Sequence, residues 1–275
     1  MIETYTDQIT KAVEYIKSKT NINPEYGIIL GSGLGELGDE VEDKVVISYK
    51  DIPNFMQSTA PSHAGNLIIG KLGGKSVLVM EGRTHLYEGY DAKEITLPVR
   101  VMQKMGIKTL IATCAAGGLN RNYKAGDLMI IKDHINFMGA NPLTGPNDNE
   151  MGTRFPVMFD CYTPDLRDIA KNVALEEKIY IHEGTYFAIA GPVYFTRAEL
   201  RFAIQTGGDA IGMSMVQEVI VAAHAGMKVL GIANITDVAL PDVEHHSTEQ
   251  EIIAIAKQTG PTFRKLIKSI LSRID

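Results

Sequence analysis

Residues 26–35 read YGIILGSGLG, an apolar run that ends in a glycine-rich turn. Further short apolar runs bounded by glycine lie at 66–70, 76–80, 109–113, 127–131, 186–190 and 229–235. We expect each run to be a buried strand, because brief apolar stretches between turn residues are typical of covered sheets. Segments with helical spacing of apolar residues fall between them, at 97–105, 165–175, 197–206 and 216–225. This alternation predicts an α/β fold with a mixed, largely parallel central sheet flanked by helices.

Local signals mark where several of these elements begin and end. Residues 72–75 (LGGK) predict a hairpin turn between two strands, and a further strand is expected at 41–49. The pairs Thr196-x-x-Glu199 and Ser214-x-x-Gln217 have the pattern of capping boxes, and Thr163-Pro164 predicts a helix start. Amphipathic helices are expected at both ends of the chain, with a break at 260–261 (Gly-Pro) before the last one. No repeat or linker interrupts the sequence, which predicts a single α/β domain over residues 1–275.

Composition limits the classes of partner. The 275 residues carry a net charge of -6, which argues against general binding of nucleic acid or anionic membranes. Cys114 and Cys161 lack the spacing of metal ligands or of a disulfide framework. We see no signal peptide and no apolar run near the ~20 residues that a membrane span requires, so we expect a cytoplasmic protein.

The glycine turn at 31–35 follows a strand and is a candidate phosphate loop. Glycines let backbone N–H groups turn toward an anion, and Ser32 adds a hydroxyl. Residues 33–38 also match a dinucleotide fingerprint, but the segment that follows reads as a strand rather than as the required helix. A plain tight turn is the third interpretation, and we favour the phosphate loop.

Several polar residues follow other expected strands. Arg83 and His85 alternate in the segment EGRTHLYEGY, so both can reach one anion, although a charged surface loop is the alternative. His63 precedes a strand, where a lone histidine is more often structural than functional. Ser214 opens a helix, where it either caps the helix or helps the N-terminus to bind an anion. Asp237 ends a strand, a common place for ligand-binding groups in α/β proteins and equally for exposed carboxylates.

Taken together, these segments resemble the trimeric class of purine nucleoside phosphorylases. The resemblance is carried in the family's order, over about residues 27–240, by GSGLG, SHAGNL, EGRTHLYEGY, AAGGLN, GDLMIIKDHINFMG, AGPVYFT and GDAIGMSMVQEVIVAAHAGMKVLGI. It implies a homotrimer with shared active sites. It also implies phosphorolysis of purine nucleosides for purine salvage, with inorganic phosphate as co-substrate and no metal or other cofactor.

The resemblance also implies which residues form the site. The phosphate ligands would be Ser32, His63, Arg83, His85, the backbone N–H of Ala115, and Ser214. The ribose would lie against Tyr87, Met213 and the Phe155 of a neighbouring subunit. The purine would contact Tyr194, Phe195, Ile211, Gly212, Thr236 and Asp237. His85, beside the phosphate, and Asp237, beside the leaving base, would be the catalytic pair.

Three positions depart from the family pattern and leave the preferred base open. Phe195 stands where the family usually has a glutamate that binds the purine, and Asp237 stands where it usually has an asparagine beside N7. A histidine near the ribose 5′-hydroxyl aligns with Glu249, although His245 and His246 are close in sequence. The alternatives are therefore a phosphorylase for 6-aminopurine nucleosides, such as adenosine or methylthioadenosine, and a nucleoside-binding relative without catalysis.

Overall fold

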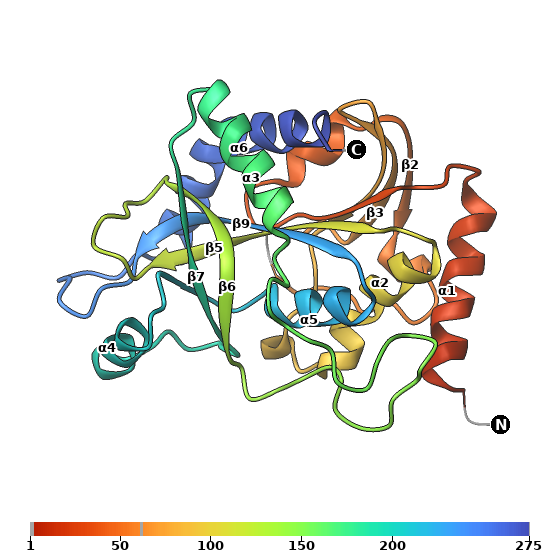
Figure 1. Ribbon diagram of the computed structural model, residues 1–275, viewed down its shortest axis with the longest axis horizontal. Helices are drawn as coiled ribbons and strands as arrows, with labels where there is room; N and C mark the ends of the chain where they lie inside the picture. Colours follow the sequence, from red (N-terminus) through yellow and green to blue (C-terminus); the bar gives the residue numbers. More distant parts are fainter. Residues whose placement is uncertain (1–2, 61–62, 275) are drawn as a thin grey trace.

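The computed structural model describes residues 3–60 and 63–274, and its strands form one mixed sheet with helices on both faces (Figure 1). The strands are β1 Tyr26–Ile29, β2 Glu42–Ser48, β3 Asn66–Leu72, β4 Lys75–Glu81, β5 Thr109–Gly118, β6 Leu128–Phe137, β7 Ile181–Ile189, β8 Ala210–Gly212 and β9 Lys228–Val238. The α-helices are α1 Tyr5–Lys19, α2 Ala92–Lys104, α3 Pro164–Glu176, α4 Arg197–Gln205, α5 Val216–His224 and α6 Glu249–Leu271. Short 3-10 helices are η1 Gly35–Glu40, η2 Tyr49–Asp51 and η3 Leu86–Glu88.

The strand order is β2-β3-β4-β1-β5-β8-β7-β6-β9, with an additional pairing between β5 and β9. Because of that pairing, β5, β8, β7, β6 and β9 close into a ring. Strand β1 runs parallel to β4 and β5, and β5 runs parallel to β9. The carboxyl ends of these four strands therefore meet on one side of the molecule.

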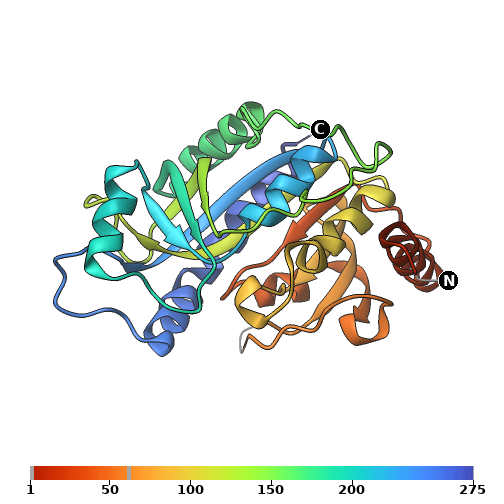
Figure 2. The same cartoon turned by 90° about the horizontal axis from the view of Figure 1, so that it is seen from below.

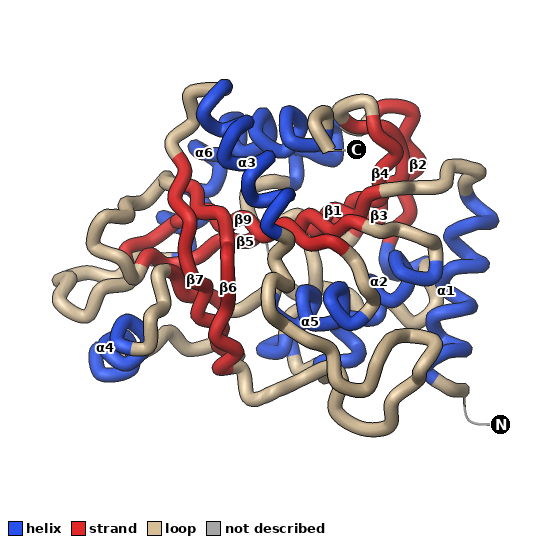
Figure 3. Tube along the Cα trace, viewed as in Figure 1, coloured by secondary structure: helices blue, strands red, loops and turns tan. Residues whose placement is uncertain are grey.

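The sheet separates two large apolar layers, and a third, smaller cluster lies beside α4. Helices α3 and α6 cover one face, and α1, α2 and α5 lie on the other (Figures 1 and 3). Alternate residues of β1 reach both layers, since Ile28 packs in the cluster of α3 and α6 while Ile29 packs in the cluster of α1, α2 and α5. Burial of one such side chain contributes about 1.5–3 kcal/mol.

Most expected elements are present, but some boundaries were wrong. The break predicted at 260–261 does not occur, because α6 continues through Pro261. Burial of Phe263, Leu266 and Ile267 against the sheet outweighs the hydrogen bond that proline removes. Gly260 also lets the helix approach the glycine turn, since a Cβ there would lie 3.1 Å from the Gly33 carbonyl oxygen.

Side-chain hydrogen bonds cap the first turn of α2 and of α4, but not that of α3. Helix α2 begins at Ala92, five residues earlier than predicted, because Asp91 accepts hydrogen bonds from the N–H groups of the first turn. The Thr196 capping box is confirmed. Thr163 precedes α3 as predicted but does not cap it, since its hydroxyl accepts from the Val229 N–H at 3.0 Å.

The glycine turn after β1 is held against β5. Thr113 donates its hydroxyl to the Ile29 carbonyl and accepts from the Gly31 N–H, both at 2.9 Å. A Cβ at Gly31 would lie 2.7 Å from the Cα of Cys114, so only glycine fits at this contact. The 3-10 helix η1 and then β2 follow this turn, and the dinucleotide fingerprint therefore lacks its α-helix.

We predict that Gly31→Ala lowers the free energy of unfolding by about 2–3 kcal/mol, because the new methyl group meets β5 backbone that cannot move aside. Gly35→Ala is the matched control in the same turn, since its Cβ would have only the Glu81 carboxylate, at 3.9 Å, within 4 Å. Urea denaturation of both variants tests this. Equal stability of the two variants would show that the close approach to β5 is not a constraint.

Candidate active site

A cavity of about 560 Å³ opens where the carboxyl ends of β1, β4, β5 and β9 meet. Strand β8 and the start of α6 complete its wall. Ligand sites of open α/β sheets commonly lie at this edge. The cavity is lined by these residues predicted as site residues from the sequence: Ser32, His63, Arg83, His85, Tyr87, Ala115, Tyr194, Phe195, Ile211, Gly212, Met213, Ser214, Thr236 and Asp237.

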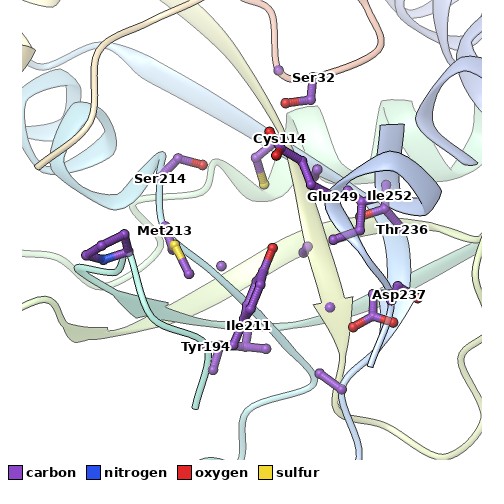
Figure 4. Close-up of a pocket in the computed structure, with 18 of the residues that line it drawn as sticks. Ser32, Cys114, Tyr194, Ile211, Met213, Ser214, Thr236, Asp237, Glu249 and Ile252 are labelled. Carbon is purple, nitrogen blue, oxygen red and sulfur yellow. The ribbon is translucent and has the colours of Figure 1, made fainter. Parts of the chain in front are cut away.

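The two ends of the cavity differ in chemistry. In Figure 4, Ser32 and Ser214 lie at one end, near Cys114, and Tyr194 and Asp237 lie at the other. Hydroxyl groups, histidines and an arginine gather at the first end, and an apolar wall with a carboxylate forms the second. The cavity can therefore hold an anion and a planar ring at the same time.

Arg83 supplies the positive charge of the anion end. Its side chain is only 2% exposed, and its guanidinium donates to the Thr113 carbonyl and lies 3.5 Å from a carboxylate oxygen of Glu218. Its Nε has no hydrogen-bond partner among the described residues. The planar, fork-shaped guanidinium can therefore still donate a hydrogen bond from this N–H group. Sequence reasoning missed Glu218, a buried acid on α5 that lies beside this arginine.

Two aromatic contacts fix His85 beside Arg83. Its ring stacks on His63, with 5.2 Å between ring centroids, and on Tyr87, with 4.6 Å. Its Nδ1 lies 2.9 Å from a carboxylate oxygen of Glu88, which also accepts from Thr59. Burial opposes ionisation of Glu88, but hydrogen bonds from His85 and Thr59 outweigh it and lower the pKa of this carboxyl to about 2. An ionised Glu88 thus orients the His85 ring at physiological pH.

His63 is held against the backbone that follows β4. Its Nδ1 lies 2.6 Å from the Arg83 carbonyl oxygen, to which it donates in the neutral tautomer that carries its proton on Nδ1. Gly82 permits this packing, because a Cβ there would lie 2.5 Å from the Cβ of His63. Burial, reinforced by the charges of His85 and Arg83, lowers the pKa of His63 to about 4. The imidazole is therefore neutral near pH 7.

The opposite end of the cavity combines an apolar wall with acidic groups. Phe195 packs at 5.8 Å from Phe187 and at 6.2 Å from Phe137 between ring centroids. Asp237 faces the cavity, with one carboxylate oxygen 3.7 Å from Nδ1 of His246. Purine rings are flat and apolar on their faces and polar at their edges, which matches a wall of this kind.

Sequence comparison identifies relatives over nearly the whole chain. The phosphorylase superfamily matches residues 25–272. Purine nucleoside phosphorylase 1 of Bacillus subtilis is 48% identical over 269 residues, which cover 98% of this chain and 99% of the relative. Purine nucleoside phosphorylase of Mus musculus is 42% identical over 98% of this chain and 96% of the relative. The chain belongs to the purine nucleoside phosphorylase family.

Solved structures of purine nucleoside phosphorylases share this fold. The Schistosoma mansoni protein in complex with adenosine superposes with a TM-score of 0.93 at 40% identity, over 97% of both chains. Its complex with inosine gives a TM-score of 0.93 at 40% identity, over 98% of this chain and 97% of that chain. The family resemblance and the mixed α/β fold predicted from the sequence are thereby confirmed.

The departures from the family pattern lie at the base end and at the start of α6. Phe195, Asp237 and Glu249 all line the cavity. Of the two adjacent histidines, His246 lines the cavity, whereas His245 is 70% exposed and lies 3.3 Å from Glu251. Sequence reasoning left open which of Glu249, His245 and His246 reaches the site. All three follow β9, outside the strands, so the alternation of a strand does not fix the direction of their side chains.

The capping box predicted at Ser214 is wrong. Helix α5 begins at Val216, and no side chain caps it, because Met215 precedes it with a φ of 71°. This left-handed residue turns the chain sharply, and Gln217 donates instead to the Ala140 carbonyl at 3.1 Å. Ser214 lines the cavity and does not cap the N-terminus of α5.

Phe155 lies outside the cavity of its own chain. It is 82% exposed and lines a separate hollow with Arg154, Met158 and Ile220. Among the described residues, no group of three histidine, cysteine, aspartate or glutamate side chains could hold a metal ion. Nor is any helix of the described part of the chain long and apolar enough to cross a membrane.

The low pKa of His63 makes stability depend on pH in a defined window. An unfolded histidine titrates near 6.5, so between about pH 6.5 and 4 the unfolded state binds more protons than the folded state. The stabilising contribution of neutral His63 is therefore present above pH 6.5 and falls by up to about 3 kcal/mol as the pH drops to 4.

We predict that His63→Gln reduces the loss of unfolding free energy between pH 6.5 and 4 by about 1–3 kcal/mol. Urea denaturation at a series of pH values measures it. His245→Gln is the control, because it removes a histidine whose side chain is 70% exposed. A His63 variant with the same pH slope as the native chain would contradict the prediction.

Proposed function

We propose that this chain catalyses the reversible phosphorolysis of purine ribonucleosides and deoxyribonucleosides, using inorganic phosphate as co-substrate and no metal or redox cofactor. The observation that carries the proposal is the buried Arg83 fork at the end of a cavity whose other end can hold a purine. Its relatives carry the same functional name, and their solved structures hold adenosine and inosine. The proposed role is purine salvage in the cytoplasm, by one α/β domain.

The proposed chemistry follows from the two ends of the cavity. Phosphate is held by side chains at one end of the cavity and by one backbone group: Arg83, His63, His85, Ser32, Ser214 and the Ala115 N–H. The ribose is bordered by Tyr87 and Met213. Phosphate attacks the anomeric carbon from the face opposite the base, and its negative charge stabilises the ribosyl cation-like transition state. Asp237 interacts with the departing base near N7, and holding both substrates in register supplies part of the rate.

A second candidate is a preference for 6-aminopurine nucleosides. A protonated carboxyl at Asp237 can donate to N7 and accept from a 6-amino group, whereas an ionised one would repel a 6-oxo group. Phe195 lacks the polar atoms that would bind N1–H or a 2-amino group. Guanine therefore loses the contacts that would distinguish it from adenine. A nucleoside-binding relative without catalysis is the third possibility.

A panel of nucleosides separates these candidates. We expect purine release from inosine, guanosine, adenosine or methylthioadenosine to require inorganic phosphate and to be unaffected by EDTA. A base-release assay with and without phosphate measures it. Full activity in phosphate-free buffer would overturn phosphorolysis, and binding without turnover of any nucleoside would favour the non-catalytic relative.

Arg83→Ala tests the proposed phosphate site in the same base-release assay. Removing the fork should raise the phosphate KM and lower kcat/KM for phosphate by at least ~100-fold, about the effect of losing one charge-assisted contact. Arg167→Ala is the control, because Arg167 pairs with Glu183 outside the cavity. Unchanged phosphate kinetics in Arg83→Ala would remove the anion site from the proposal.

The exposed apolar segment after Arg154 supports a homotrimer with shared sites. Phe155, Val157 and Phe159 are 82%, 74% and 90% exposed. Apolar side chains that gather at the surface commonly mark a contact between protein chains. We propose that Phe155 of each subunit completes the ribose site of its neighbour.

We predict that Phe155→Ala raises the nucleoside KM by about tenfold, the loss of one buried aromatic contact, and leaves the chain folded and trimeric. Steady-state kinetics and analytical sedimentation measure the two effects. Phe159→Ala controls for the segment itself, because the proposal assigns it no contact with nucleoside. An active monomer, or equal KM changes in both variants, would contradict the shared site.

A further inference from the structure

Asp237 and His246 form a pair at the base end of the cavity that the family resemblance does not contain. The Nδ1 of His246 lies 3.7 Å from a carboxylate oxygen of Asp237, within ion-pair distance. The Asp237 side chain is 14% exposed and that of His246 is 40% exposed, and both line the cavity. The Asp237 carboxylate is thus the more buried of the two groups, and the His246 imidazole lies between it and solvent.

The chain on either side of His246 fixes which way its ring points. Thr248 and Glu251 form the capping box that begins α6, and the His245 ring lies 3.3 Å from the same Glu251 carboxylate. His245 is therefore drawn toward the helix, while the next side chain reaches the cavity. This connection between β9 and α6 projects from one end of the molecule (Figures 1 and 2), so the outer face of the imidazole is open to water.

The departing base needs a proton at this end. When the bond between C1′ and N9 breaks, its electron pair passes to the purine, which becomes neutral by taking a proton at N7. An ionised carboxylate has no proton to give, so Asp237 needs a source. Histidine exchanges protons near neutral pH, and the other histidines that line the cavity, His63 and His85, lie at its phosphate end.

We propose that His246 supplies, through Asp237, the proton that the leaving purine takes at N7. This inference rests on the proposed phosphorolysis. Asp237 gives its proton to N7 as the C1′–N9 bond breaks and the phosphate oxygen bonds to C1′. The His246 imidazolium returns a proton to Asp237 and is itself reprotonated by water. The attacking hydrogen phosphate releases one proton to solvent, so the overall reaction neither gains nor loses protons.

Other charged and titratable groups face the same pair. Tyr194 lies close enough to Asp237 and to Glu249 for both charges to act on it, and all three residues line the cavity. The Tyr194 phenol is a weak acid whose pKa is raised further by burial and by Asp237 and Glu249, so it is a poor donor to the base. His246 is positioned to serve as the acid of this group.

The test compares substrates that need the proton with one that does not. In 7-methylinosine the ring already carries a positive charge, so the base leaves neutral without protonation. We expect His246→Gln to lower kcat for inosine and adenosine by about 100-fold or more, the usual range for loss of general acid catalysis, and kcat for 7-methylinosine by no more than about twofold. Asp237→Ala, which leaves no polar group beside N7, should show the same separation between substrates.

His245→Gln is the matched control, since its ring lies outside the cavity and should leave all three substrates unaffected. Equal loss on inosine and 7-methylinosine in His246→Gln would overturn the proposal and assign the residue a structural role. No loss on either would also overturn it. A 4-nitrophenyl riboside, whose phenolate leaves without a proton, replaces 7-methylinosine if the native chain does not accept it. Absence of phosphorolysis in the native chain would instead contradict the proposed function.

Discussion

Thr113 joins the parts of the molecule on which the cavity depends. Its hydroxyl bonds to both sides of the turn after β1, and its carbonyl accepts a hydrogen bond from the Arg83 guanidinium. One residue of β5 thereby fixes the glycine turn and the principal cation relative to each other. The short distance from Gly31 to the β5 backbone leaves no room for a side chain. The requirement for glycine in this turn and the position of the Arg83 guanidinium therefore depend on the same contacts with β5.

The sequence was informative wherever a functional residue follows a strand. Arg83 and His85 were predicted to reach one anion, and Asp237 was a separate candidate because it ends a strand; the structure places all three around one cavity. Anion binding by Ser32, Arg83 and His85 was predicted from the residues, whereas the contacts to ribose and purine were available only through the family resemblance. Spacing alone gave equal weight to function and to plain surface loops.

The features that the sequence did not reveal depend on tertiary contacts. Helix α6 continues through Pro261 because packing on the sheet outweighs a local helix-breaking signal. Met215 adopts a left-handed conformation that no capping rule anticipates, and it is this turn that brings Ser214 to the cavity. Glu218 carries no local motif, and only the fold shows that it lies beside Arg83. In each case a contact between distant segments decides the outcome.

The two ends of the cavity are built from different kinds of structure, and the departures from the family at Phe195 and Asp237 lie at the base end. The phosphate end is built where β1, β4 and β5 end, with backbone contacts too close to vary without loss of stability. The base end is bordered by Tyr194 and Phe195, before α4, and by the connection from β9 to α6. Loops of this kind accept substitution more readily than strands packed on both faces. A change of base preference is therefore compatible with an unchanged phosphate site, because a transition state with positive charge on the ribose needs the anion whichever purine departs.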